Sequence, residues 1–436
     1  MNTGGAKIVS VSNNGVRMCA AAARISTTDG GAQKAIERGD GDKKDLKLIG
    51  KVIASGHKTI LEHLAFTIAF QDVSVLAEQG LIEFRLASYT VKSRRYVDFS
   101  GAGYVVPDGL TEKMTEIYKS NMDARFDDYR RLLDLDIARE DARFVLPYCF
   151  KSNFYMTLNA RELAHVIASM KYGRLSRYEE FQRIGESLEN QLKEIMGDTD
   201  IGEKPSQAKY AHKDKDVIFS SLHVCAPEAE VVIAPENPEK ALDFALTLTD
   251  RFEGENAIRQ LVRDARPREL EMLSYGFTVK NVSLSCVTHF TRHRMQSLIV
   301  PYVEEALLDG GYVLPKSVKN NKEALAVYEN AFKNNLENAK KLHALGADKA
   351  LLAYFALSGN TVDILFTMNA RELLHFMKLR TCTRAQWEIR DAASDMLSGL
   401  MESFPALFKY FGPSCAVNGF CPEGRLSCGR LQKSEE

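Results

Sequence analysis

Three basic side chains occupy residues 292–294, where Arg-His-Arg ends an apolar stretch. Moving a charge out of water is costly, so Arg292, His293 and Arg294 cannot all be buried without partners. One interpretation is a basic loop in solvent. The other is recognition of an anion or a flavin, because the arginine fork matches phosphate oxygens and carbonyl edges.

A second group that could bind phosphate lies earlier in the chain. Ser93 and Arg95, within Ser-Arg-Arg-Tyr ending at Tyr96, place a hydroxyl among guanidiniums. Arg143 precedes an apolar segment, and Arg380 ends the stretch NARELLHFMKLR. Fixed cations of this kind can hold a nucleotide phosphate or polarise a carbonyl.

The chain has eight cysteines, and three of them crowd into a Gly- and Pro-rich tail. Three thiols so close in sequence could reach one point, and a fourth could come from the end of the preceding helix. Four thiolates suit zinc or an iron–sulfur cluster, although the spacing is not a CxxC pair and simple loop thiols remain the alternative. The candidate ligands are Cys382, Cys415, Cys421 and Cys428.

The chain contains two copies of one unit. Residues 159–163 and 369–373 both spell NAREL, and LEHLAFTIAFQDVS (61–74) returns as LEMLSYGFTVKNVS (270–283). A repeat of this length is a whole domain, so we expect domains at 1–205 and 215–436, joined by the polar stretch 197–216.

The differences between the copies single out functional candidates, since a residue that only one copy keeps is not required by the fold. His63 has Met272 as its counterpart, and Arg95 has Glu304. NAREL occurs in both copies, so part of its role is expected to be capping and packing. His375 has a counterpart, His165, so a shared structural role competes with ligand binding.

Periodicity predicts the elements that position these residues. Alternating, β-branched stretches at 68–75 and 277–285 indicate strands, each leading into a helix-compatible stretch at 75–85 or 286–294. Helices are expected at 160–171 and 370–380, with Asn159 and Asn369 as N-caps, and long helices at 112–133 and 322–342. Regular βαβ alternation and nucleotide-binding glycine motifs are missing, so we expect an α+β fold with a mixed or antiparallel sheet and long helices in each copy.

The composition excludes several classes of protein. A net charge of −1 and 45% hydrophobic residues are ordinary for a globular protein and give no nucleic-acid footprint. No apolar run predicts a membrane span, and the N-terminus lacks a signal-peptide pattern. We therefore expect a cytoplasmic protein.

Taken together, GHKTILEHLAFT, FRLASYTVKSRRYV, DARFVLP, RHR and NARELLHFMKLRTCTRAQWEIR resemble the flavin-dependent thymidylate synthase (ThyX) family across both halves of the chain. The resemblance implies conversion of dUMP to dTMP with FAD, methylenetetrahydrofolate and NADPH. Because the family's members are homotetramers, it also implies a homodimer of this tandem chain that acts as a pseudo-tetramer.

The resemblance also implies residue roles. Ser93 and Arg95, with Tyr96 beside them, match the phosphate loop; Arg143 and Arg380 match the arginines that hold the pyrimidine, and Arg380 would activate the uracil. Gln386 and Glu388 would orient the helix. Flavin binding falls on His63, Arg292, His293, Arg294, Asn369, Arg371 and His375.

One departure from the family pattern leaves alternatives open. The family carries its Arg-His-Arg motif and its phosphate loop in one continuous stretch, whereas here the first lies in the second copy and the second in the first copy. Either complementary losses leave sites shared between the copies, or the chain has changed its chemistry. The alternatives are another flavin-dependent pyrimidine-modifying reaction and a non-catalytic protein that binds nucleotide or flavin.

Overall fold

A computed structural model describes residues 4–26, 29–39, 41–197, 199, 201–202, 216–252, 254 and 256–430. The described chain forms two compact units. The first comprises residues 1–218 and 327–356, and the second comprises residues 219–326 and 357–436. The predicted join at 197–216 lies largely outside the described residues, and the domain boundaries at 1–205 and 215–436 stay a prediction.

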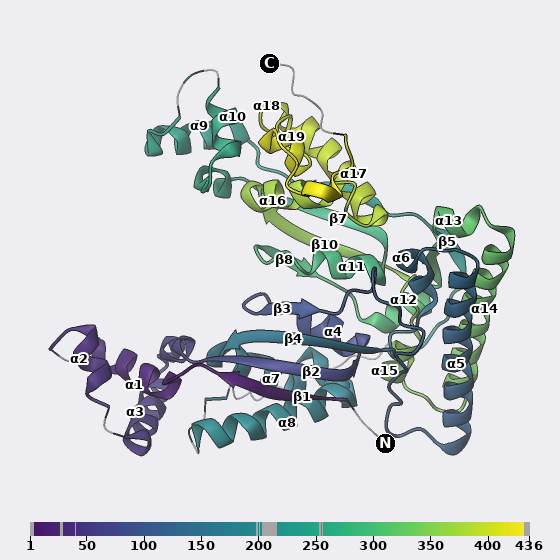
Figure 1. Cartoon of the computed structure of the whole chain (residues 1–436), viewed down its shortest axis with the longest axis horizontal. Helices are drawn as coiled ribbons and strands as arrows, with labels where there is room; N and C mark the ends of the chain where they lie inside the picture. The colour runs from purple at the N-terminus through teal and green to yellow at the C-terminus, as the bar shows by residue number, and fades with distance from the viewer. Residues whose placement is uncertain are drawn as a thin grey trace. The chain divides into compact units, whose positions relative to one another are not determined.

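The first unit is built on a four-stranded antiparallel sheet in the order β1-β2-β4-β3. Helices α7 and α8 pack together, α8 packs on β1, and α7 follows directly from β4 (Figure 1). Alternate residues of β4 are buried, which is why the sheet has one covered face. The elements contributed by the first copy are β1 (Gly5–Val11), α1 (Gly15–Ile25), α2 (Ala32–Glu37), α3 (Asp42–Ala54), η1 (Lys58–His63), β2 (Ala65–Ser74), α4 (Val75–Ile82), β3 (Ser88–Val91), α5 (Glu112–Asp134), α6 (Arg139–Ala142), η2 (Arg143–Val145), β4 (Lys151–Asn159), α7 (Ala160–Tyr172), η3 (Arg174–Arg177) and α8 (Glu179–Met196).

The first unit also contains a piece of the second copy. This piece is most of α14 (Lys322–Ala344), α15 (Lys349–Leu352) and η5 (Ala353–Phe355). Helix α5 binds it through buried polar contacts: Asn121 Nδ2 donates to Asn335 Oδ1 at 2.8 Å, and Arg125 donates to the carbonyl of Ala331 at 2.7 Å. Buried polar pairs of this kind fix how two helices pack, because either partner alone would be left unsatisfied.

The second unit repeats the design with a four-stranded antiparallel sheet in the order β6-β7-β10-β8 and a small parallel pair, β5-β9. Helices α16 and α17 pack against this sheet (Figure 1). Its elements are β5 (His223–Cys225), β6 (Glu228–Ile233), α9 (Pro238–Thr249), α10 (Ala257–Arg263), η4 (Arg268–Met272), β7 (Ser274–Ser283), α11 (Leu284–Phe290), β8 (Gln296–Ile299), α12 (Val303–Asp309), β9 (Gly311–Val313), α13 (Lys316–Lys319), β10 (Thr361–Asn369), α16 (Ala370–Arg380), α17 (Trp387–Ser403), α18 (Pro405–Phe408), α19 (Ser414–Asn418) and η6 (Gly424–Leu426).

Each unit ties its central strand to a helix through one buried glutamate. Glu180 accepts from the backbone N–H of Ser74 at 2.9 Å and from its hydroxyl at 2.5 Å. Glu388 accepts from the same two groups of Ser283, at 2.7 and 2.6 Å. Burial raises the pKa of Glu180. The equivalent contacts show that this glutamate serves the fold in both copies.

The predicted elements are confirmed, with two helix ends corrected: α4 ends at Ile82 and α11 ends at Phe290, before the predicted ends at Arg85 and Arg294. The Asn159 and Asn369 side chains accept from the backbone N–H groups of Glu162 and Glu372, as N-caps do. The apolar stretch before the Arg-His-Arg motif is helical only as far as Phe290, so the motif lies in the turn between α11 and β8. In the described part of the chain, no helix has the length and apolar character needed to span a membrane.

Candidate active site

The Arg-His-Arg turn of the second unit separates its three side chains. His293 is buried, whereas Arg292 and Arg294 are exposed. The alternation follows from the turn, which directs the middle side chain inward. The two guanidiniums therefore lie at the surface of the site, and the imidazole belongs to its interior.

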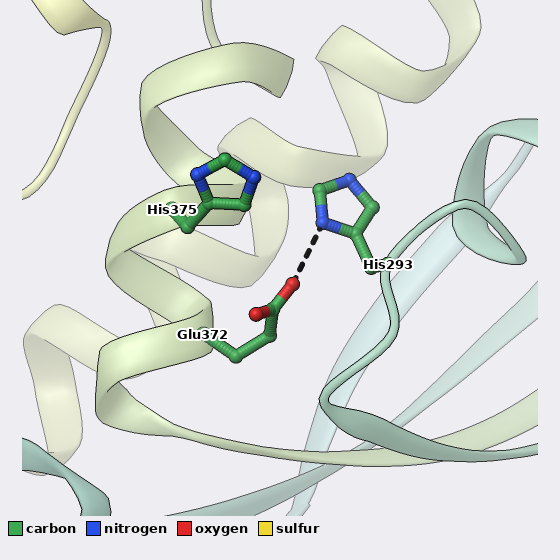
Figure 2. Close-up of side chains that lie close together, drawn as sticks. All are labelled: His293, Glu372 and His375. Atoms are coloured by element: carbon green, nitrogen blue, oxygen red, sulfur yellow. Dashed lines mark hydrogen bonds and ion pairs between the residues drawn. The ribbon is translucent and has the colours of Figure 1, made fainter. Parts of the chain in front are cut away.

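His293 contacts helix α16 through Glu372. Its Nδ1 lies 2.9 Å from Glu372 Oε1, and the carboxylate reaches it from the first turn of α16 (Figure 2). His375 lies one turn further along this helix, and its ring centroid is 5.7 Å from that of His293. Glu372 belongs to NAREL, His375 follows that motif by two residues, and His293 is the middle residue of the Arg-His-Arg motif, so the fold brings the two stretches together.

Arg380 closes the same cluster from the last turn of α16. Its Nε–H donates to His293 Nε2 at 3.0 Å, and its terminal nitrogen donates to the backbone carbonyl of His289 at 3.2 Å. Arginine can only donate, so Nε2 must carry a lone pair and the ring proton must be on Nδ1. The order of donation is therefore Arg380 to His293 to Glu372.

Burial keeps this imidazole neutral. Desolvation lowers the pKa of His293 to about 4, and the Arg380 charge acts in the same direction against the hydrogen bond to Glu372. At neutral pH the cluster thus holds one fixed cation, Arg380, one carboxylate and a neutral ring between them. Such an arrangement suits the stabilisation of negative charge that develops on a bound ligand.

A metal ion fits this cluster less well than a ligand that carries negative charge. His293, Glu372 and His375 are the group that the described residues bring within reach of one ion. Both ring nitrogens of His293 are already hydrogen-bonded, however. The positive charge of Arg380, whose Nε lies 3.0 Å from His293 Nε2, would also repel a metal cation bound to this ring.

The predicted thiolate site does not form. Among the described residues, Cys382 and the three tail cysteines do not gather into a group that could hold an ion. Cys415 lies in the first turn of α19, and Cys428 is exposed in the segment beyond η6. Cysteines at these spacings can reach one point, but the spacing does not force them to do so. In the structure the tail packs along α16 instead, where the Ser414 hydroxyl donates to the Lys378 carbonyl.

The first copy keeps the place of this cluster but not its chemistry. Phe84 stands where the second copy has His293, and its ring packs edge-on against His165 at 5.6 Å. Met170, the counterpart of Arg380, is buried, and the neighbouring Lys171 pairs with Glu189 at 2.6 Å. A cavity of about 370 Å³ remains there, lined by Glu83, Phe84, Arg85, Glu162, His165 and Arg174 among others.

The nucleotide-binding candidates of the first copy, which are the phosphate loop and the pyrimidine-holding Arg143, do come together in the first unit. Arg95 Nε lies 2.8 Å from Glu140 Oε2, and Arg143 Nε donates to the Glu140 carbonyl at 3.1 Å. Ser93 Oγ accepts from the Arg95 backbone N–H at 3.4 Å, and Tyr96 is exposed. Glu140, which the sequence did not single out, joins the two arginines.

Two of the remaining candidates, Arg371 and Asn369, make contacts that both copies share. Arg371 pairs with Glu271, as Arg161 pairs with Glu62 in the first copy. Asn369 caps α16, which confirms the capping role expected from NAREL. His63 is exposed at the end of η1. Flavin-binding roles for these residues stay predictions.

Glu372 is a second residue, besides Glu140, that sequence reasoning missed. It lies in NAREL, and the presence of this motif in both copies predicts a role in capping and packing. The sequence does place this carboxylate one turn before His375 on a helix that ends at Arg380, and that spacing could have marked Glu372 as a site residue.

Comparison with known proteins matches both halves of the chain. The model of the family described as thymidylate synthase complementing protein matches residues 7–196 and 208–406. A flavin-dependent thymidylate synthase of Clostridium tetani is 30% identical over 253 residues, covering 54% of this chain and 97% of the relative. A second, from Geobacter sulfurreducens, is 42% identical over 121 residues, covering 27% and 52%. The solved UMP/dUMP methylase PolB of Streptomyces cacaoi, bound with 5-Br dUMP, is 26% identical, with a TM-score of 0.38 over 44% of this chain and 90% of that one.

Proposed function

Because the chain belongs to the thymidylate synthase complementing protein family, as a tandem duplication of the family's domain, we propose that it is an FAD-dependent methyltransferase that converts dUMP to dTMP. The carbon would come from methylenetetrahydrofolate and the reducing hydride from NADPH. The relatives named above are flavin-dependent thymidylate synthases.

The observation that carries this proposal is the contact between Arg380 and the neutral, buried His293. A guanidinium held in a fixed position beside a uracil carbonyl stabilises negative charge on that oxygen, and so stabilises the enolate whose C5 attacks the carbon donor. The ring of His293 holds Arg380 without adding a second positive charge. The first copy lacks both residues, so this role belongs to the second copy alone.

The residues around the cluster fit a flavin. Arg292 and Arg294 are exposed on either side of the buried imidazole, and two such forks suit a pyrophosphate or the carbonyl edge of a flavin ring. When bound, FAD would supply the redox chemistry of the reduction. His375, Asn369, Arg371 and His63 would complete its binding.

The nucleotide phosphate would use residues of the first copy. Ser93 and Arg95 would hold it with one hydroxyl and one cation, Arg143 would hold the pyrimidine, and Glu140 contacts both arginines. A complete site therefore needs residues of both copies, and we propose a homodimer that acts as a pseudo-tetramer. The cytoplasmic location expected from the sequence stays a prediction.

The test is the visible spectrum of the purified protein, titrated with dUMP. A flavin band that shifts at one dUMP per chain, together with growth of a thymidylate-synthase-deficient host without thymidine, is the expected result. Flavin without a response to dUMP would indicate another substrate, and absence of flavin would indicate a binding protein. Either result would overturn the proposal.

A further inference from the structure

The carboxylate of Glu372 is two hydrogen bonds away from the guanidinium of Arg380, with the ring of His293 between them. We propose that Glu372 is a positioning residue: it fixes the tautomer of His293 and thereby aims the guanidinium of Arg380 at the substrate. The inference rests on the proposed function, in which Arg380 acts on the pyrimidine.

The first step of the argument is the number of protons on the ring. A neutral imidazole carries one proton, and Arg380 requires that Nε2 accept. The proton on Nδ1 then needs an acceptor, because an unpaired buried donor costs free energy. Glu372 Oε1, at 2.9 Å, is that acceptor.

The second step is the consequence of losing that acceptor. Without the carboxylate, the tautomer with the proton on Nδ1 would lose its acceptor, and Arg380 alone would oppose the tautomer with the proton on Nε2. Nε2–H and the Nε–H of Arg380 would then be two donors facing each other across 3.0 Å. The guanidinium would have to turn away from the ring, although its hydrogen bond to the carbonyl of His289 does not depend on the tautomer.

The duplicated sequence separates this role from a structural one. Glu162 occupies the equivalent place on α7, where Asn159 Oδ1 accepts from its backbone N–H at 2.9 Å, as Asn369 Oδ1 accepts from that of Glu372. A glutamate at the third residue of a helix is the usual capping-box position, so both glutamates have a reason to be there. The second copy adds the ring of His293, where the first copy has Phe84.

The experiment compares Glu372→Ala and Glu372→Gln with the matched pair Glu162→Ala and Glu162→Gln. Nitrogen NMR of protein labelled at its nine histidines reports the tautomer of His293, which a His293→Phe sample assigns. Steady-state assays give kcat and KM for dUMP, and the visible spectrum gives flavin content.

We expect Glu372→Ala to move the His293 proton to Nε2 and to lower kcat by about 10- to 100-fold, as loss of an orienting partner typically does. Flavin content should be unchanged. Glu372→Gln keeps an acceptor oxygen, so it should retain the Nδ1–H tautomer and most of kcat. Both Glu162 variants should stay within about twofold of the parent protein.

Two results would overturn the inference. One is an unchanged His293 tautomer in Glu372→Ala. The other is an equal fall of kcat in the Glu372 and Glu162 variants, which would show a capping role alone. If the parent protein makes no thymidylate, the proposed function fails, but the NMR comparison still decides whether Glu372 sets the tautomer.

Discussion

Arg380 Nε donates to His293 Nε2 at 3.0 Å, across 87 residues of sequence. The contact joins the end of one helix to the turn that follows another, and it makes the position of a cation depend on the protonation of a ring. Arg380 also donates to the carbonyl of His289, so the guanidinium is held from two directions. The first copy has Phe84 and Met170 in place of His293 and Arg380, so it serves as an internal reference for the substitutions below.

Arg380→Met copies the residue that the first copy carries at Met170. Removal of one fixed charge that stabilises a developing oxyanion commonly costs about 100- to 1000-fold in kcat. We expect a loss of this size, with flavin retained, in a thymidylate assay. Met170→Leu in the first copy is the control, and a similar loss there would contradict the assignment of Arg380.

His293→Phe should change how stability depends on pH. The pKa of the folded ring, about 4, lies below its unfolded value of 6.5, so the unfolded chain binds more protons between these values. The contribution of the ring is complete above pH 6.5 and is lost as pH falls toward 4. Between pH 7 and pH 5 we expect the parent protein to lose about 2 kcal/mol more unfolding free energy than His293→Phe.

Urea unfolding of both proteins at the two pH values measures this difference. The exposed His165, changed to alanine, is the control, because its ring is not enclosed in the cluster. An identical pH dependence in the parent protein and His293→Phe would show that the folded ring titrates normally.

Arg143→Ala introduces the residue that the second copy has at the equivalent position, Ala353. A charge-assisted hydrogen bond to the bound nucleotide contributes about 1.5–3 kcal/mol, so KM for dUMP should rise by roughly 10- to 100-fold with less change in kcat. Arg130→Ala, an exposed position on α5 paired with Asp127, should leave KM unchanged. A kcat effect without a KM effect would place Arg143 elsewhere in the mechanism.

Arg292→Ala combined with Arg294→Ala should release the flavin while the fold is retained, because both side chains are exposed. The ratio of flavin absorbance to protein absorbance, with circular dichroism for folding, measures the effect. The matched first-copy change is Arg85→Ala. Unchanged flavin content in the double variant would remove these arginines from the binding site.

The sequence by itself determined the duplication, the strands and helices, and the helix caps. These features depend on local patterns: strand alternation, helical periodicity, and an asparagine followed by a glutamate three residues later. It also identified the Arg-His-Arg motif and the residues that only one copy keeps, because a difference between repeats is visible without any structure.

Only the tertiary structure decided which partners these residues have. His293, Glu372 and Arg380 meet because α16 packs beside the turn after α11, and no local pattern encodes a hydrogen bond across 87 residues. The same holds for Glu140, which joins Arg95 and Arg143, and for the tail cysteines, whose proximity in sequence did not become proximity in space. Sequence spacing limits how far apart two side chains can be, whereas packing decides whether they meet.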